Sequence, residues 1–167
     1  DVYKRQDTVD PDGLLEYSVV FTDRSLNHMS KKFQVVMNDL SSILKEVYNT
    51  DGVALVPGGG TYGMEAVARQ VAVNKHALVI RNGYFSYRWS QIFDSGNFTK
   101  KTTIVKARQI GNEETSPFAP APIDEIVAKI HETKPDVVFA PHVETSAGVL
   151  LPKAYLETIS KAAHDVG

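Results

Sequence analysis

A triple-glycine turn between an apolar run and a helical pattern constrains this sequence most. Residues 53–56 are apolar and rich in Val, the glycines Gly58, Gly59 and Gly60 follow closely, and apolar residues then recur at helical spacing. Glycine permits positive φ angles and close approach to the backbone, and the Thr61 hydroxyl is positioned to cap the next helix. A helix entered this way presents free N–H groups and the positive end of its dipole, so the turn predicts an anion site, typically for phosphate.

The glycine turn alone leaves several interpretations open. A P-loop requires Gly-Lys-Ser/Thr after the glycines, and no Lys follows here. Gly58, Gly60 and Gly63 match the dinucleotide fingerprint, but that fingerprint expects an acidic residue about 20 residues later, and the next predicted strand ends at Arg81 and Asn82. A cofactor with one phosphate monoester, such as pyridoxal phosphate, and a turn that merely joins a strand to a helix both remain open.

Two further segments, taken with the glycine turn, resemble the class V aminotransferase family. The first is Val-Ile-Arg-Asn-Gly-Tyr-Phe-Ser-Tyr-Arg-Trp at residues 79–89, and the second is Ala-Pro-His-Val-Glu-Thr-Ser-Ala-Gly-Val-Leu-Leu-Pro at residues 140–152. Their order and spacing are similar to those of the alanine–glyoxylate, serine–glyoxylate and serine–pyruvate aminotransferases, which are pyridoxal-phosphate enzymes of fold type I. The similarity extends from about Leu26 to the C-terminus. The His-x-Glu-Thr-Ser-Ala-Gly segment is fairly specific, whereas the glycine turn alone is not.

This resemblance implies cofactor-binding roles for five residues. In the family, donors at the start of the helix bind the cofactor phosphate, and the matching residues here are Gly59, Gly60 and Thr61. The family also stacks an aromatic ring on the pyridine after an Asn-Gly pair, which implies Phe85. The hydroxyl that reaches the phenolic oxygen of the ring corresponds to Thr145.

Residues near these five receive other interpretations. Without the neighbouring motifs, Phe85 would be interpreted as an ordinary core residue, and the aromatic residues close enough to compete with it are Tyr84, Tyr87 and Trp89. Glu144 and Ser146 are expected to shape the turn rather than to contact substrate. His142 has no second His at ligand spacing, so no metal site is predicted.

The resemblance also implies what these 167 residues lack. In the family, the Asp that pairs with the pyridine nitrogen, the Schiff-base Lys and the small domain with the substrate-binding Arg all follow the helix predicted here at residues 152–164. We therefore expect an inactive fragment that stops before the groups that do covalent chemistry. Residues 1–6 match no family position and are interpreted as a non-native leader. Residues 7–24 are interpreted as an N-terminal arm, and residues 25–167 as the N-terminal portion of the cofactor-binding large domain.

Alternating strand and helix patterns predict an α/β fold with a mainly parallel sheet flanked by helices, and the resemblance implies that it is a partial large domain of fold type I. The predicted strands are residues 53–56, 77–80, 102–106 and 137–140. The predicted helices are residues 27–48, 61–74, 85–95, 123–133 and 152–164, and residues 109–122 are interpreted as a loop. Both motif segments follow strands, at the edge where open α/β sheets bind ligands, so the glycine turn, Phe85 and Thr145 should line one cleft.

Composition narrows the possible function. The net charge is −2, 43% of residues are hydrophobic, 23% are charged, and there is no cysteine. These values predict neither nucleic-acid nor membrane binding, and no disulfide framework. No membrane-spanning run or signal peptide is present, which favours a cytoplasmic location.

We expect the parent to be a homodimeric pyridoxal-phosphate transaminase that moves an amino group between an amino acid and a 2-oxo acid such as glyoxylate or pyruvate. One alternative is another class V enzyme, such as a lyase or a desulfurase-like protein, which would share the same cofactor cradle. The other is a non-enzymatic nucleotide- or phosphate-binding module, which the glycine turn by itself would also suit.

Overall fold

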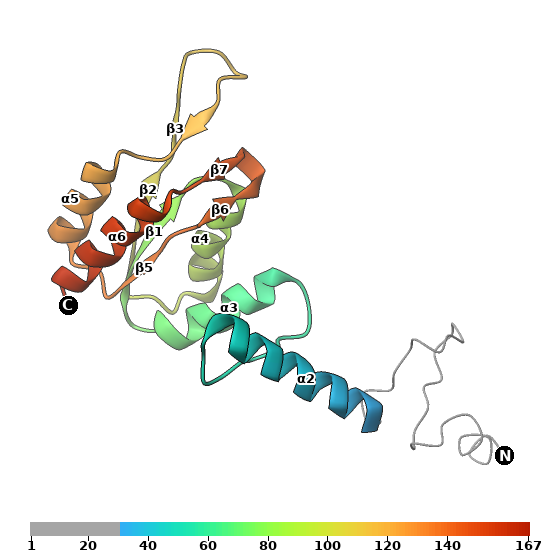
Figure 1. Ribbon diagram of the computed structural model, residues 1–167. Helices are drawn as coiled ribbons and strands as arrows, with labels where there is room; N and C mark the ends of the chain where they lie inside the picture. Colours follow the sequence, from blue (N-terminus) through green and yellow to red (C-terminus); the bar gives the residue numbers. More distant parts are fainter. Residues whose placement is uncertain (1–30) are drawn as a thin grey trace. The chain divides into compact units, whose positions relative to one another are not determined.

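The computed structural model describes residues 31–167 and divides the chain into two compact units, Asp1–Leu55 and Val56–Gly167 (Figure 1). The leader expected at residues 1–6 and the arm expected at residues 7–24 lie outside the described residues. The cofactor-binding portion expected from residue 25 onward therefore corresponds mainly to the second unit.

The described part of the first unit is dominated by one helix, α2 (Lys31–Tyr48). Its residues follow an apolar periodicity, yet none of them is buried. The helix ends at Tyr48, and Asn49 adopts a left-handed φ of 47°, which is a common way to terminate a helix. The predicted helix at residues 27–48 is confirmed from Lys31 onward.

The second unit is built on a parallel sheet of three strands in the order β2 (Lys101–Lys106), β1 (His76–Arg81) and β5 (Val137–Phe139). Leu78 pairs with Thr103 on one side and with Val138 on the other. The central strand is the run Ala-Leu-Val-Ile flanked by polar residues, and those four apolar residues are fully buried. An uninterrupted apolar run is typical of a strand covered on both faces.

Helices cover the two faces of this sheet (Figure 1). They are α3 (Gly60–Val71), α4 (Tyr84–Gly96), α5 (Ile123–Thr133) and α6 (Lys153–Asp165). Successive strand residues point to opposite faces, so Leu78 and Ile80 pack against α5 and α6, whereas Ala77 and Val79 pack against α3 and α4. Each large apolar side chain buried in this way contributes about 1.5–3 kcal/mol to stability. The predicted α/β class, with a parallel sheet flanked by helices, is confirmed.

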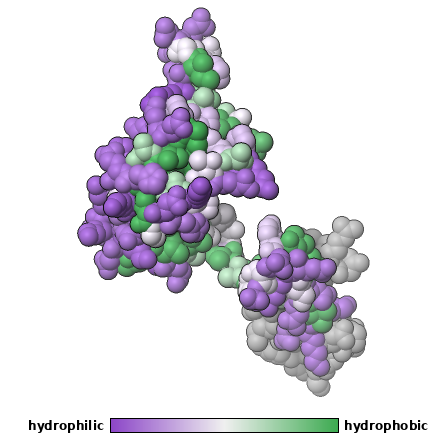
Figure 2. Space-filling view, turned by 60° about the vertical axis from the view of Figure 1, so that its left-hand side comes forward, coloured by the Kyte–Doolittle hydropathy of each residue, from purple (hydrophilic) through white to green (hydrophobic). Residues whose placement is uncertain are grey.

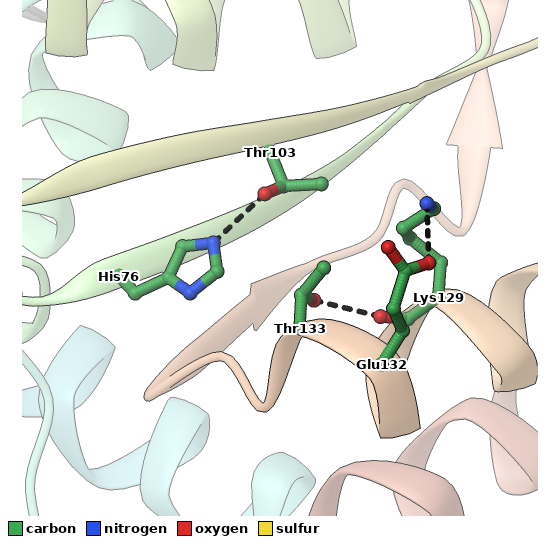
Figure 3. A network of polar contacts seen from close by, with 5 residues as sticks. All are labelled: His76, Thr103, Lys129, Glu132 and Thr133. Carbon is green, nitrogen blue, oxygen red and sulfur yellow. Dashed lines mark hydrogen bonds and ion pairs between the residues drawn. The ribbon is translucent and has the colours of Figure 1, made fainter.

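Polar contacts fix the amino-terminal edge of the sheet, as Figure 3 shows in part. The ring Nε2 of His76 lies 2.8 Å from the hydroxyl of Thr103 on the neighbouring strand. The Asp136 carboxylate accepts a hydrogen bond from the His76 amide at 2.7 Å, just before β5 begins. Burial and the nearby Lys101 lower the pKa of His76, so its ring stays neutral. These contacts align the three strands, so their carboxyl ends lie together at the opposite edge.

The predicted strand at residues 53–56 is wrong. These residues have extended or irregular backbone without a strand partner among residues 31–167, and Leu55 and Val56 are 43% and 44% exposed. An apolar, β-branched segment satisfies the residue preference of a strand. A strand also needs a neighbouring backbone to accept its hydrogen bonds, and a local pattern does not reveal whether one is present.

The loop expected at residues 109–122 contains regular structure that its composition did not predict. β3 (Arg108–Gln109) and β4 (Phe118–Ala119) form a short antiparallel pair. The Gln109 side-chain amide donates to the carbonyls of Glu113 (2.7 Å) and Ser116 (3.2 Å). One side chain therefore provides hydrogen bonds to two backbone carbonyls of the loop that joins β3 and β4. Figure 1 shows this hairpin extending away from the sheet.

The surface of the described residues is mostly hydrophilic on the face shown in Figure 2, with smaller hydrophobic areas between the charged side chains. Exposed apolar side chains also occur on α3, where Tyr62, Val67 and Val71 are 61%, 49% and 39% exposed. Among residues 31–167, no helix combines the length and the apolar character that crossing a bilayer would require.

Candidate functional site

A fully buried carboxylate, Glu144, joins the two motif segments. It lies in β6 (Val143–Glu144), which precedes a 3-10 turn, Thr145–Ala147, and the short strand β7 (Val149–Leu150). Its two oxygens accept hydrogen bonds from the Phe85 amide at 3.0 Å and the Ser86 amide at 2.8 Å. The hydroxyls of Ser86 and Ser146 donate to the same carboxylate, each at 2.5 Å.

These contacts make Glu144 the N-terminal cap of α4. The free amides at the start of a helix and the positive end of its dipole favour a negative charge there. Here the negative charge is the carboxylate of Glu144, which lies 58 residues after Ser86 in the chain. Burial by itself would raise the pKa of Glu144, but the hydrogen bonds from Ser146 and Ser86 outweigh it and hold the pKa below its usual value. The carboxylate is therefore ionised at neutral pH.

The Asn-Gly pair before α4 is fitted closely to this carboxylate. The Ser86 hydroxyl accepts hydrogen bonds from the amides of Asn82 (2.9 Å) and Gly83 (3.1 Å), and the Ser146 hydroxyl accepts one from the Tyr84 amide at 2.8 Å. A Cβ atom on Gly83 would lie 2.5 Å from the Ser146 hydroxyl and 2.7 Å from Cγ of Glu144. Only glycine fits at this position without a shift of its neighbours.

Two of the five predicted cofactor-binding residues, Phe85 and Thr145, are brought together by this network. Phe85 is the second residue of α4, and its side chain is 46% exposed. Thr145 begins the 3-10 turn directly after Glu144, and it is also exposed. Both are therefore held at the carboxyl edge of the sheet and remain accessible, although their backbone surroundings are buried.

The other three predicted residues lie at the start of α3. The turn takes a positive φ only at Gly58 (128°), where the ring of Tyr62 occupies the space of a Cβ atom. Gly59 precedes the helix in extended conformation, and Gly60 is its first residue. Cβ atoms on Gly59 and Gly60 would meet no atom within 4 Å, so the backbone here is open to an approaching ligand.

The predicted capping role of Thr61 is wrong. The helix begins one residue earlier, at Gly60, so Thr61 lies inside it and the capping position is Gly59, which has no side-chain oxygen. The Thr61 hydroxyl instead accepts a hydrogen bond from Nη1 of Arg88 at 2.8 Å. Within residues 31–167, the amides of Gly60 and Thr61 donate no hydrogen bond.

Arg88 is a site residue that sequence analysis missed. It lies on α4 one turn after Phe85, so the two share a helix face, and its guanidinium lies 5.1 Å from the centre of the Tyr84 ring. Its Nε is buried and has no hydrogen-bond partner within the described residues. The only sequence signal was its spacing from Phe85, and the contact with Thr61 appears only once α3 and α4 pack together.

The start of α3 therefore has the chemistry of an anion site. It combines unpaired helix amides, an open glycine backbone, the Thr61 hydroxyl and the positive charge of Arg88, whose Nη1 donates to that hydroxyl. Thr61 and Arg88 also line a pocket of about 320 Å³ between α3 and α4, which includes the Glu65 carboxylate and does not include Gly59 or Gly60. No group of three or more His, Asp or Glu side chains among residues 31–167 could hold a metal ion.

Comparison with known proteins identifies the fold. No protein-family model matches the sequence, and no curated protein matches it. Among solved structures, the chain is similar to ureidoglycine–glyoxylate aminotransferase from Bacillus subtilis, with a TM-score of 0.59 and 23% sequence identity. The match covers 79% of this chain and 33% of that structure, so this chain spans about a third of its length. The likeness shows that the matched part of the chain shares part of the fold of that structure.

Proposed function

We propose that this chain is part of a pyridoxal-phosphate-dependent aminotransferase of the class V family. The observation that carries the proposal is the open start of α3, where the amides of Gly60 and Thr61 have no hydrogen-bond partner within the described residues. The Thr61 hydroxyl and Arg88, which are bonded to each other, lie beside these amides. The likeness to a solved aminotransferase supports the proposal, because the matched part of the chain shares that structure's fold. A phosphate monoester suits such a site by charge and geometry.

The residues present fit this cofactor in three places. The amides of Gly60 and Thr61 and the guanidinium of Arg88 would hold its phosphate, Phe85 would stack on its ring, and the Thr145 hydroxyl would donate to its phenolic oxygen. Exposure of both Phe85 and Thr145 supports the latter two contacts. The bound cofactor would supply an electron sink for amino-group transfer, while Glu144 holds the two ring-binding segments at a fixed separation.

The proposed substrates are an amino acid and a 2-oxo acid such as glyoxylate or pyruvate. The solved relative is itself named for a reaction with glyoxylate, which supports this class. We propose that turnover and a homodimeric state belong to the whole protein, because this chain spans about a third of that relative. A soluble, cytoplasmic enzyme is the corresponding proposal for location.

A pair of glycine variants tests the phosphate site. Gly60→Val should abolish the binding of pyridoxal phosphate, because a side chain there would fill the open space in front of the backbone. Gly63→Val is the matched control, since a Cβ atom at Gly63 in the same helix also meets no atom within 4 Å. Calorimetric titration of both variants and the unaltered chain would show the difference. Equal affinity in all three would remove Gly60 from the site.

Titration with a dinucleotide separates the proposed function from a nucleotide-binding module. The unaltered chain should bind pyridoxal phosphate and bind NAD at least about tenfold more weakly, because the strand after the glycine turn ends without the carboxylate that would hold a ribose. Tight NAD binding without pyridoxal phosphate binding would favour the module instead.

A further inference from the structure

A second opening lies at the carboxyl ends of β1 and β2. It is a pocket of about 620 Å³ whose wall comes from the residues after β1, the end of β2, Pro117 and Phe118 at the hairpin, and the 3-10 turn. None of the five residues predicted to bind the cofactor lines it, and neither does Arg88. Open α/β sheets bind ligands along this edge, so its lining defines a site separate from the start of α3.

The pocket carries two positive charges and no carboxylate among its lining residues. The guanidinium of Arg81 lies 5.0 Å from the centre of the Tyr87 ring, and Lys106 is exposed at the end of β2. In the part of the chain that the structure describes, neither cation forms an ion pair. The buried Glu144 is committed to α4 and Ser146 through both of its oxygens. The pocket therefore attracts an anion.

A buried amide in the same wall has no partner. Asn82 is 3% exposed, and within the described residues neither its Oδ1 nor its Nδ2 forms a hydrogen bond. Buried side-chain amides in folded proteins are almost always satisfied. Both atoms are fully enclosed, so a ligand in the pocket would reach them only if the Asn82 side chain turned toward it. This observation is independent of the two cations.

Three aromatic side chains also contribute to the pocket wall. Tyr84, Tyr87 and Phe118 line the pocket, and all three side chains are more than a third exposed. Exposed aromatic rings that surround one opening favour a planar ligand, because ring faces stack on one another. An inorganic anion alone would leave these rings in contact with water.

We propose that this pocket binds a planar organic anion. Its carboxylate or phosphate group would pair with Arg81 and Lys106, and its ring would lie against Tyr84 and Tyr87. Charge-assisted hydrogen bonds to two cations would supply most of the selectivity for the charged form. The site goes beyond the proposed cofactor cradle and does not depend on it.

Three small probes test the chemistry with the full 167-residue chain. Benzoate carries a planar carboxylate, phenyl phosphate a planar phosphate, and benzamide is a neutral molecule of the same shape. At least one of the two anions should bind about tenfold more tightly than benzamide in calorimetric titrations, and the tighter anion identifies the head group. Equal affinity for benzamide and both anions, or no binding of either anion, would overturn the proposal.

Charge-removing variants locate the site. Arg81→Gln and Lys106→Gln should each weaken binding of the preferred anion about tenfold and leave benzamide unchanged. Lys100→Gln is the control, because it removes an equal charge just before the other end of β2. Arg81→Gln removes the contact with the Tyr87 ring and could prevent folding. Lys106 is exposed, so Lys106→Gln tests the site even in that case. Unchanged affinity in Lys106→Gln would overturn the assignment.

The Gly60→Val variant separates this site from the cofactor cradle. It should bind the preferred anion as the unaltered chain does, even though its affinity for pyridoxal phosphate is expected to fall because the start of α3 is blocked. Loss of anion binding in Gly60→Val would show that the probe occupies the start of α3 and would contradict a second site. Failure of the unaltered chain to bind pyridoxal phosphate would count against the proposed function alone.

Discussion

The two helices that carry the proposed cofactor contacts begin in opposite ways. At α4, the side chains of Ser146 and Glu144 accept hydrogen bonds from the first three amides, although they lie 58 to 62 residues away in the chain. At α3, no side chain caps the helix, and the first amides have no partner within the described residues. The same backbone chemistry is satisfied internally at one helix and left available at the other. A helix start closed by a buried carboxylate is structural, and an open one is suited to a ligand.

The largest expected effect of a single substitution is at Glu144. Glu144→Ala removes the acceptor for two amides and two hydroxyls in a fully buried position. Because buried donors left unpaired each cost about 1–3 kcal/mol, we expect the free energy of unfolding to fall by about 3 kcal/mol or more. Urea unfolding followed by circular dichroism measures this. A loss below about 1 kcal/mol would show that water replaces the carboxylate and that the contrast with α3 is weaker than described.

Gly83→Ala should have the next largest effect. Its new methyl group would meet the Ser146 hydroxyl and Glu144 within 2.5–2.7 Å, and overpacking of this kind costs about 1–3 kcal/mol. The cost is steric, because Gly83 has an extended φ of 175° that any residue can adopt. Thermal unfolding of Gly83→Ala beside Gly63→Ala, where a Cβ atom meets open space, isolates the clash. Equal midpoints for both variants would contradict a close fit around the Asn-Gly pair.

Acid should selectively weaken the closed helix start. Hydrogen bonds from Ser146 and Ser86 keep the pKa of Glu144 below its usual value despite burial. A carboxyl group with a lowered folded-state pKa stabilises the protein above its unfolded-state pKa, and this contribution is lost as the pH falls through the folded-state pKa. Glu144→Gln should therefore lose less stability than the unaltered chain between about pH 6 and about pH 3. If the two proteins lost equal stability across that range, the lowered pKa assigned to Glu144 would be contradicted.

Gly60→Ala should have the smallest effect on stability. The new methyl group meets no atom within 4 Å, and replacing a helical Gly by Ala changes stability by only about 0.5–1 kcal/mol, usually upward. The unfolding midpoint of this variant should stay equal or rise slightly. A clear loss of stability would show that the open start of α3 contributes to the fold.

Local patterns predicted the sheet and most helices well. Residues 123–133 form α5 with the predicted bounds, because Pro122 precedes a first turn that carries Asp124 and Glu125 at the positive end of the helix. The four buried residues of β1 form an uninterrupted apolar run, which is typical of a strand covered on both faces. In both cases the information lies within the segment itself.

Contacts between distant segments were not predictable in the same way. The strand expected at residues 53–56 lacks a partner among the described residues. Strand pairing depends on segments that are distant in the sequence, so a local pattern could not predict it. Glu144 was expected to shape its own turn, yet it caps a helix 58 residues earlier. Arg88 was not identified, because its link to Thr61 exists only after two helices pack. The roles of Gly59, Gly60, Thr61, Phe85 and Thr145 in cofactor binding stay predictions.

The distance in sequence between Glu144 and α4 also has a consequence for synthesis on the ribosome. When α4 has left the ribosome, neither its cap nor β5, which pairs with the central strand β1, has yet been translated. The first half of the second unit must therefore wait, with an unsatisfied helix start and one open strand edge, until residues 137–146 emerge. Because exposed strand edges can pair with other chains, a pause in translation before residue 137 would prolong the interval in which the nascent chain is most prone to aggregate.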